Sequence, residues 1–115
     1  MSKTDELFDS NPFDFSSQSQ ELFRASFREA ALANYEGNLF FQRLWKKLGI
    51  NPENLKTEAD LEKAPPMLVN LFKEHDLKSV PDTEIILTLT SSGTSGQKSR
   101  IHLNQKSLDR VKKSA

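Results

Sequence analysis

Apolar residues recur with helical spacing in the first half of the chain. Between residues 17 and 35 they stand at i, i+4 and i+7/i+8, on one stripe of a helix: Phe23, Phe27, Ala30 and Ala31. Ser17 offers an N-cap, and Gln20, three residues later, offers its capping-box partner. Because the intervening residues are good helix formers, the pattern predicts a helix from Ser17 to about Tyr35.

A second amphipathic stretch follows the interruption at Glu36–Gly37–Asn38. Its apolar residues share one helical face: Phe41, Leu44, Trp45 and Leu48. The pattern predicts a helix from about Leu39 to Leu48, which ends at Gly49 as the residue after the C-cap. Because Trp45 lies on the apolar stripe, we expect it in the core rather than against a ligand.

Two shorter helices are predicted before the first strand. Thr57 can cap a helix from Glu58 to Lys63, with Asp60 as its capping-box partner, and a pair of prolines ends it. The apolar residues between Met67 and His75 suit another short helix. Val80–Pro81–Asp82 then predicts a turn.

The best strand of the chain is Glu84 to Thr90, where apolar and β-branched residues follow one another almost without interruption. Such a run is typical of a buried strand. Arg100 to Leu103 predicts a second strand, and Asn104 the N-cap of a last helix toward Ala115. We therefore expect an α/β fold in which N-terminal helices are followed by a strand–loop–strand unit, with the two strands antiparallel.

Residues 1–16 show no period, although they include Phe8, Phe13 and Phe15. We predict a flexible N-terminal arm here, or one that docks through its phenylalanines. Residues 17–115 would then form the folded part of the chain.

Charge is balanced overall but unevenly distributed. Lys+Arg and Asp+Glu are both 16, so no net charge steers the chain to nucleic acid or anionic lipid. The N-terminal end is acidic and the C-terminal end is basic. The basic end follows a loop with two glycines, described below, and this combination suits an anionic ligand. For the four basic residues from Lys106 onward, a solvated helix face is the favoured interpretation.

Composition excludes several classes of protein. A chain of 115 residues suits one domain or a piece of a larger one. The absence of cysteine excludes disulfides and thiolate metal sites. No apolar run is long enough to span a membrane, and the N-terminus lacks the apolar region of a secretory signal, so a cytoplasmic protein is the default expectation.

The most informative stretch is residues 90–101, TSSGTSGQKSRI, directly after the first predicted strand. Its two glycines permit close backbone approach to a ligand, and its consecutive N–H groups and hydroxyls suit phosphate oxygens. Lys98 adds a point charge. Gln97 separates Gly96 from Lys98, which is not Walker A spacing, and the third glycine of a Rossmann fingerprint is missing. The loop predicts a triphosphate or pyrophosphate cradle, with a plain hairpin loop as the alternative.

The loop and the elements before it resemble the N-terminal part of the acyl-protein synthetase (LuxE) family, which belongs to the adenylate-forming superfamily. The resemblance spans about residues 20–110. It rests on the helix ending at Leu48–Gly49–Ile50, the Thr57–Asp60–Leu61 helix with Pro65 after it, the Leu71–Phe72–Lys73 patch with His75, and the SSGTSGQKSRI loop. Most superfamily members have proline and then lysine or threonine where this chain has Lys98 and Ser99; acyl-protein synthetases commonly look like this chain.

This resemblance implies that a fatty acid or other carboxylate is activated with ATP and Mg²⁺ as an acyl-adenylate. The acyl group would then pass to a cysteine of an acceptor protein, of which a reductase is one candidate. The residues implied to hold the ATP phosphates are Ser91, Ser92, Gly93, Thr94, Ser95 and Gly96, with Lys98 as a weaker candidate. Neither a catalytic residue nor a Mg²⁺ ligand is assigned within the chain, and no nucleic-acid partner is expected.

In the family, the adenine pocket, the acyl tunnel and the accepting cysteine would follow the loop. We therefore expect residues 17–115 to be an N-terminal fragment of the adenylate-forming domain, inactive alone. The alternative is a non-catalytic helical protein-interaction module derived from such an enzyme, whose helices expose these aromatic residues: Phe23, Phe27, Phe41 and Trp45. His75 is either structural or borders the active site, and its separation from His102 gives no metal spacing.

Overall fold

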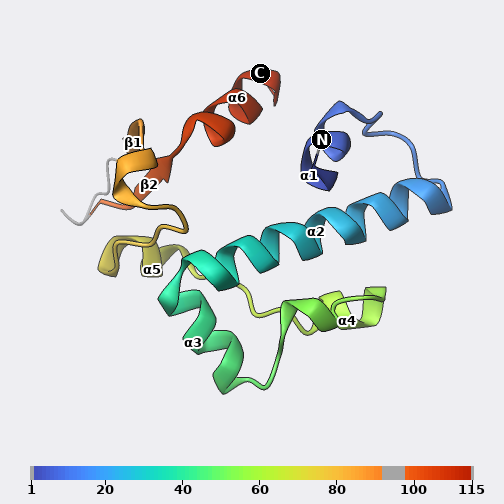
Figure 1. Ribbon diagram of the computed structural model, residues 1–115, viewed down its shortest axis with the longest axis horizontal. Coiled ribbons are helices and arrows are strands. Elements are labelled where there is room, and N and C mark those ends of the chain that lie inside the picture. The colour runs from blue at the N-terminus through green and yellow to red at the C-terminus, as the bar shows by residue number, and fades with distance from the viewer. Residues whose placement is uncertain (1, 92–97, 115) are drawn as a thin grey trace.

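The computed structural model describes residues 2–91 and 98–114, and it combines helices with one two-stranded antiparallel sheet (Figure 1). The helices are α1 (Lys3–Asp9), α2 (Ser17–Gly37), α3 (Leu39–Lys47), α4 (Glu58–Glu62), α5 (Val69–Glu74) and α6 (Gln105–Ser114). The strands are β1 (Leu87–Thr90) and β2 (Arg100–Leu103), and single 3₁₀ turns lie at Pro52–Asn54 and Asp82–Glu84. The predicted α/β class, with helices followed by a strand pair, is confirmed.

Helix ends follow the caps in the sequence, with one correction. The N-cap of α2 is Ser16, not Ser17, because it is the Ser16 side chain that accepts a hydrogen bond from the Ser19 N–H. Gln20 does not complete a capping box with Ser17; its side-chain amide donates to the Phe15 carbonyl instead. Elsewhere the predictions hold: Gly49 has a positive φ of 73° after α3, and α4 has a complete capping box.

The core lies where α2, α3 and the segment after α3 meet. Ala31, Trp45 and Leu55 are buried there, and Trp45 is only 2% exposed. Its ring stacks on Phe41, with ring centroids 4.9 Å apart. Partly buried residues complete the cluster: Phe27, Tyr35, Phe41, Leu44, Ile50, Leu61 and Ala64. The expectation that Trp45 belongs to the core is confirmed.

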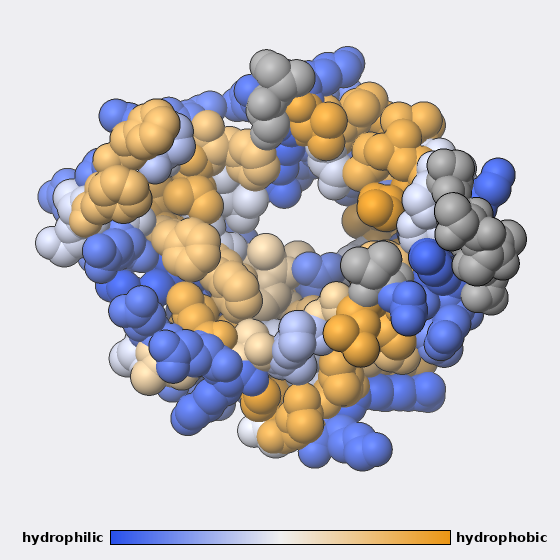
Figure 2. Space-filling model, turned by 180° about the vertical axis from the view of Figure 1, so that it is seen from behind, coloured by the Kyte–Doolittle hydropathy of each residue, from blue (hydrophilic) through white to orange (hydrophobic). Residues whose placement is uncertain are grey.

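Around this core the chain is open. The radius of gyration is 15.4 Å, larger than the roughly 13 Å typical of a compact domain of this length. Figure 2 shows an opening through the middle of the molecule, with hydrophobic residues along much of its border. The helices and the hairpin thus leave considerable apolar surface uncovered.

The N-terminal residues form a helix that the sequence pattern did not predict. The Ser26 hydroxyl of α2 donates to the Lys3 carbonyl, 2.7 Å away. The Glu29 carboxylate, also on α2, accepts from the Lys3 N–H at 2.8 Å and from the Thr4 N–H and hydroxyl. Phe13 and Phe15, by contrast, are 80% and 78% exposed. In this structure the N-terminal segment is therefore held by polar contacts of α1, not by these two phenylalanines.

The basic C-terminal helix is paired with this acidic N-terminal helix (Figure 1). Arg110 Nε lies 3.0 Å from an Asp5 oxygen, Lys113 Nζ lies 3.1 Å from Asp9, and Lys106 Nζ lies 3.9 Å from Asp5. The interpretation of this α6 face as solvated holds for Lys106 and Lys113, which are more than half exposed despite these ion pairs, but not for Arg110, which is partly buried against Asp5. Their partners are more than 100 residues away in the chain, beyond the reach of a local pattern.

These carboxylates make the docking of α1 sensitive to acid. The Ser2 hydroxyl and then the Arg110 guanidinium lower the pKa of Asp5 to about 2. Burial raises the pKa of Glu29, but hydrogen bonds from Lys3, Thr4 and Ser2 together outweigh it and lower that pKa. Because a lowered folded-state pKa stabilises above the unfolded pKa, this contribution is complete near pH 5 and is lost as the pH falls toward 2.

We expect Glu29→Ala to release α1 at neutral pH, since three hydrogen bonds to the start of α1 lose their acceptor. The protection of the residue 3–9 amides from hydrogen exchange, relative to the intrinsic rate at the same pH, should be lost in this variant, and also in the wild type below about pH 3. Glu21→Ala, at an exposed position of the same helix, is the matched control and should leave this exchange unchanged. Slow exchange of α1 in Glu29→Ala would show that other contacts hold the helix.

The first strand is shorter and more exposed than predicted. It begins at Leu87, opposite Leu103 of β2, since residues Asp82–Glu84 form a 3₁₀ turn. All four residues of β1 are exposed in the described part of the chain, so the prediction of a buried strand is wrong. The second strand, Arg100–Leu103, and the antiparallel pairing are as predicted.

Candidate functional site

The candidate phosphate loop lies between the two strands. Of the residues assigned to it, Ser92, Gly93, Thr94, Ser95 and Gly96 lie outside the described part of the chain, and their prediction stays a prediction. Ser91 and Lys98 are described, and they flank the loop directly after β1 and before β2. The structure therefore describes the two ends of the loop, which we call its base.

Two serines close that base. The Ser91 N–H donates to the Ser99 carbonyl, and the Ser99 N–H donates to the Ser91 hydroxyl; the donor–acceptor distance is 3.1 Å in both hydrogen bonds. The two hydroxyl oxygens are 2.6 Å apart, and Ser99 is buried. Ser91 retains a proton for a ligand only when the Ser99 hydroxyl is the donor of this pair. Sequence reasoning assigned Ser91 to phosphate and gave Ser99 no role; the structure makes both residues partners in closing the loop.

Cations stand next to this base. Lys98 is exposed and makes no ion pair within residues 2–91 and 98–114. Arg100 begins β2 opposite Thr90, and its nearest carboxylate oxygen, on Asp76, is 3.7 Å away. A side chain two residues further along β2, His102, shares the Arg100 face because side chains alternate along a strand. The hairpin therefore presents one polar, cationic face and one apolar face.

Asp76 joins the groups on the polar face. Its carboxylate accepts from His102 Nε2, lies 3.7 Å from Arg100 Nε and 3.5 Å from Lys78 Nζ. The hydrogen bond from His102 is the main cause that lowers the pKa of Asp76, so the carboxyl is ionised at neutral pH. His102 Nδ1 lies 2.9 Å from the Thr88 hydroxyl on β1. Sequence reasoning missed Asp76, whose partners on β2, Arg100 and His102, lie 24 and 26 residues away.

His75 does not join this network. Its ring lies against Phe40 of α3, with ring centroids 5.1 Å apart. This contact favours the structural interpretation of His75. Among the described residues no group of three His, Cys, Asp or Glu side chains could hold a metal ion, so the structure assigns no Mg²⁺ ligand.

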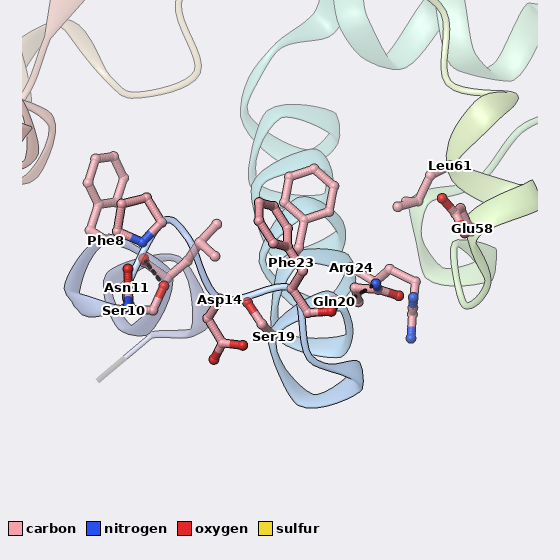
Figure 3. A pocket seen from close by; sticks show the side chains of 13 residues that line it. Phe8, Ser10, Asn11, Asp14, Ser19, Gln20, Phe23, Arg24, Glu58 and Leu61 are labelled. Atoms are coloured by element: carbon pink, nitrogen blue, oxygen red, sulfur yellow. Dashed lines mark hydrogen bonds between the residues drawn. The ribbon is translucent and has the colours of Figure 1, made fainter.

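A separate pocket of about 670 Å³ lies far along α2 from the hairpin, between α1, the start of α2 and α4 (Figure 3). Phe8, Phe23 and Leu61 come from these three helices, with polar groups such as Asp14 and Arg24 beside them. Ser91 and Lys98, the described residues of the predicted phosphate loop, do not line this pocket. It is therefore not part of the candidate site.

Comparison with known protein families supports the resemblance seen in the sequence. The family described as acyl-protein synthetase, LuxE, matches residues 1–115, the whole chain. The protein is thus of the acyl-protein synthetase class. Within that class it belongs to the LuxE family. No individually curated protein matches the chain. No helix among the described residues is both long and apolar enough to cross a membrane.

Proposed function

We propose that this chain supplies the polyphosphate-binding loop of an ATP-dependent acyl-protein synthetase. The observation that carries the proposal is the closed base of the loop, in which Ser91 and Ser99 are hydrogen-bonded at the ends of two paired strands. Such a base holds both ends of a Ser/Thr/Gly loop at a fixed separation. Membership of the LuxE family supports the same assignment.

The donor set fits a polyphosphate. Loop N–H groups and hydroxyls between Ser91 and Gly96 would hold the β- and γ-phosphates of ATP, with Lys98 as an added cation. A carboxylate and an α-phosphate repel each other, so charge neutralisation by these donors and by Mg²⁺ would be needed before they meet. The loop's own task in this proposal is to bind and orient the phosphates.

In the proposed reaction a fatty acid or other carboxylate attacks the α-phosphorus of ATP and pyrophosphate leaves. The resulting acyl-adenylate passes its acyl group to a cysteine thiol of an acceptor protein, and AMP is released. A reductase is one candidate acceptor, and a cytoplasmic setting would suit the reaction. The chain itself has no cysteine, so an acceptor thiol must come from elsewhere.

The test is tripolyphosphate binding to the purified chain by calorimetry. Thr94→Ala removes a donor and should weaken binding by about tenfold, the effect of one lost hydrogen bond of this kind. Gly96→Ala obstructs close backbone approach and should also weaken binding. Thr83→Ala, an exposed threonine in the 3₁₀ turn before β1, is the control and should bind like the wild type. The matching substitutions in a full-length family member should slow ATP–pyrophosphate exchange. Unchanged binding in both loop variants would make the loop a plain connection.

A second candidate is a non-catalytic helical interaction module, favoured by the exposure of Phe13, Phe15 and Phe23. The aromatic set predicted for such a surface needs correction, because Trp45 is buried and Phe27 and Phe41 pack against the core. Light scattering separates the two candidates. A discrete oligomer with no affinity for tripolyphosphate would favour the module.

A further inference from the structure

The hairpin that carries the loop is tied to the helices through a short segment, residues 76–79. This segment lies between the C-terminal end of α2 and strand β2. One of its ends contacts the helix and the other contacts the strand. It is therefore placed to fix the orientation of the hairpin relative to the helical part.

The helix end of the segment is fixed at Ser79. Its hydroxyl donates to the Asn34 side-chain oxygen of α2. Its carbonyl oxygen lies so close to Gly37 that a Cβ added there would overlap it. Ser79 thus packs directly on the α2 backbone, with no side chain between them.

The strand end of the segment is fixed at Asp76, through its hydrogen bond with His102. Because the ionised carboxylate accepts this bond, His102 Nε2 carries the proton. When the ring is neutral, Nδ1 is then unprotonated and accepts from the Thr88 hydroxyl, 2.9 Å away; when the ring is protonated, Nδ1 donates to that hydroxyl instead. Asp76 therefore orients an imidazole that links the two strands to each other.

This link lies close to the loop base. Thr88 is three residues before Ser91, and His102 is three residues after Ser99, a distance of about 10 Å along each strand. The pair Thr88 and His102 is also a register pair of the hairpin. A shift of either strand at this link would move the serines that close the loop.

We propose that Asp76 is a positioning residue: acting through His102 and Thr88, it holds the Ser91–Ser99 base in the geometry that binds polyphosphate. The expected effect on polyphosphate binding rests on the proposed function, whereas the expected effect on the geometry of the Ser91–Ser99 base does not. Arg100, at 3.7 Å from Asp76, is a weaker second contact of the same carboxylate.

The experiment compares Asp76→Ala with Asp82→Ala in the whole chain. Both remove a carboxylate that contacts Lys78, but only Asp76 contacts His102. We expect Asp76→Ala to weaken tripolyphosphate binding about fivefold or more, the lower end of the coupling between separate sites. Asp82→Ala should bind like the wild type. Asp76→Asn keeps an oxygen that can accept from the imidazole and should recover most of the lost affinity.

Two NMR readouts decide the structural part. Measured at a pH where the ring is neutral, the nitrogen shifts of His102 should show the Nε2–H form in the wild type and a mixture of forms in Asp76→Ala. Hydrogen exchange of the Ser91 and Ser99 amides should speed up in Asp76→Ala and stay unchanged in Asp82→Ala. If the Asp76 variant does not fold, Thr88→Val, which removes the hydroxyl and keeps the side-chain shape, should shift the same readouts in the same direction.

The outcomes are distinct. If the wild type fails to bind tripolyphosphate, the proposed function fails, and the serine amides alone decide whether Asp76 positions the base. If the wild type binds and the Asp76→Ala and Thr88→Val variants bind equally well with unchanged serine exchange, the positioning role is overturned.

Discussion

Replacement of Trp45 by alanine is expected to remove most of the stability of this chain. Trp45 is 2% exposed, stacks on Phe41 and packs with Ala31 and Leu55. Truncating a buried tryptophan costs about 3–5 kcal/mol through lost burial and the cavity left behind. Domains are stable by only about 5–15 kcal/mol, and this chain has a small buried cluster, so its stability should lie at the low end.

Urea unfolding followed by far-ultraviolet circular dichroism measures this effect, since the variant lacks the chain's single tryptophan as a fluorophore. Phe13→Ala is the matched control, because Phe13 is also aromatic but 80% exposed. Its free energy of unfolding should change by less than about 0.5 kcal/mol. Equal losses in the two variants would show that the α2–α3 cluster is not what holds the fold together.

Trp45→Phe provides a finer test of the same site. The Trp45 Nε1 is buried and has no hydrogen-bond partner within the described ranges. Phenylalanine keeps much of the apolar contact and removes this unpaired donor, which by itself costs about 1–3 kcal/mol. We therefore expect Trp45→Phe to be clearly milder than Trp45→Ala.

Sequence pattern predicted the elements whose signals are local. The stripe at Phe23 and Phe27, the cap at Thr57 and the glycine at 49 each depend on residues within one or two turns. The helix α1 has no such stripe, and what holds it is Glu29, 25 and 26 residues away. It was missed because this contact is tertiary, although Ser2 is a capping residue.

The strand prediction failed for a related reason. Apolar residues on both faces of Glu84–Thr90 predict burial, but burial requires a neighbour to cover the strand. In this chain Leu87, Leu89 and Ile101 lie exposed on the apolar face of the hairpin, although Leu103 on the same face is buried. A pattern shows which surface can be buried, whereas only the fold shows whether it is.

The candidate site likewise contains some residues that a local sequence signal predicted and others that no such signal could reveal. Loop composition pointed to Ser91 and Lys98, because glycines and hydroxyls are informative wherever they cluster. Asp76 and Ser99 gave no such signal: one is an acid in a polar segment, and the other is one serine among several. Their roles depend on the strand register, which pairs Ser99 with Ser91 and brings His102 to Asp76.

The second large effect is expected at Gly37, the last residue of α2. Its φ is not positive, so an alanine would suit the helix and gain about 1 kcal/mol of helix propensity. The added Cβ would nevertheless overlap the Ser79 carbonyl oxygen, a backbone atom that cannot turn away. Overpacking of this kind costs about 1–3 kcal/mol, sometimes more. We therefore expect Gly37→Ala to be destabilised overall, with its backbone shift centred on residues 76–79.

Gly49→Ala is the control that separates the two roles of glycine. Gly49 has a φ of 73° and open space where a Cβ would stand. Alanine there should cost about 1–2 kcal/mol, from the left-handed backbone alone. Both variants should lower the urea midpoint, but only Gly37→Ala should change the amide shifts of Asn34 and Ser79 and speed exchange at Ser91 and Ser99. If Gly37→Ala left these four amides unchanged, the segment 76–79 would not transmit the position of α2 to the loop base, and the hairpin would be held by its contacts with α5 and α6 instead.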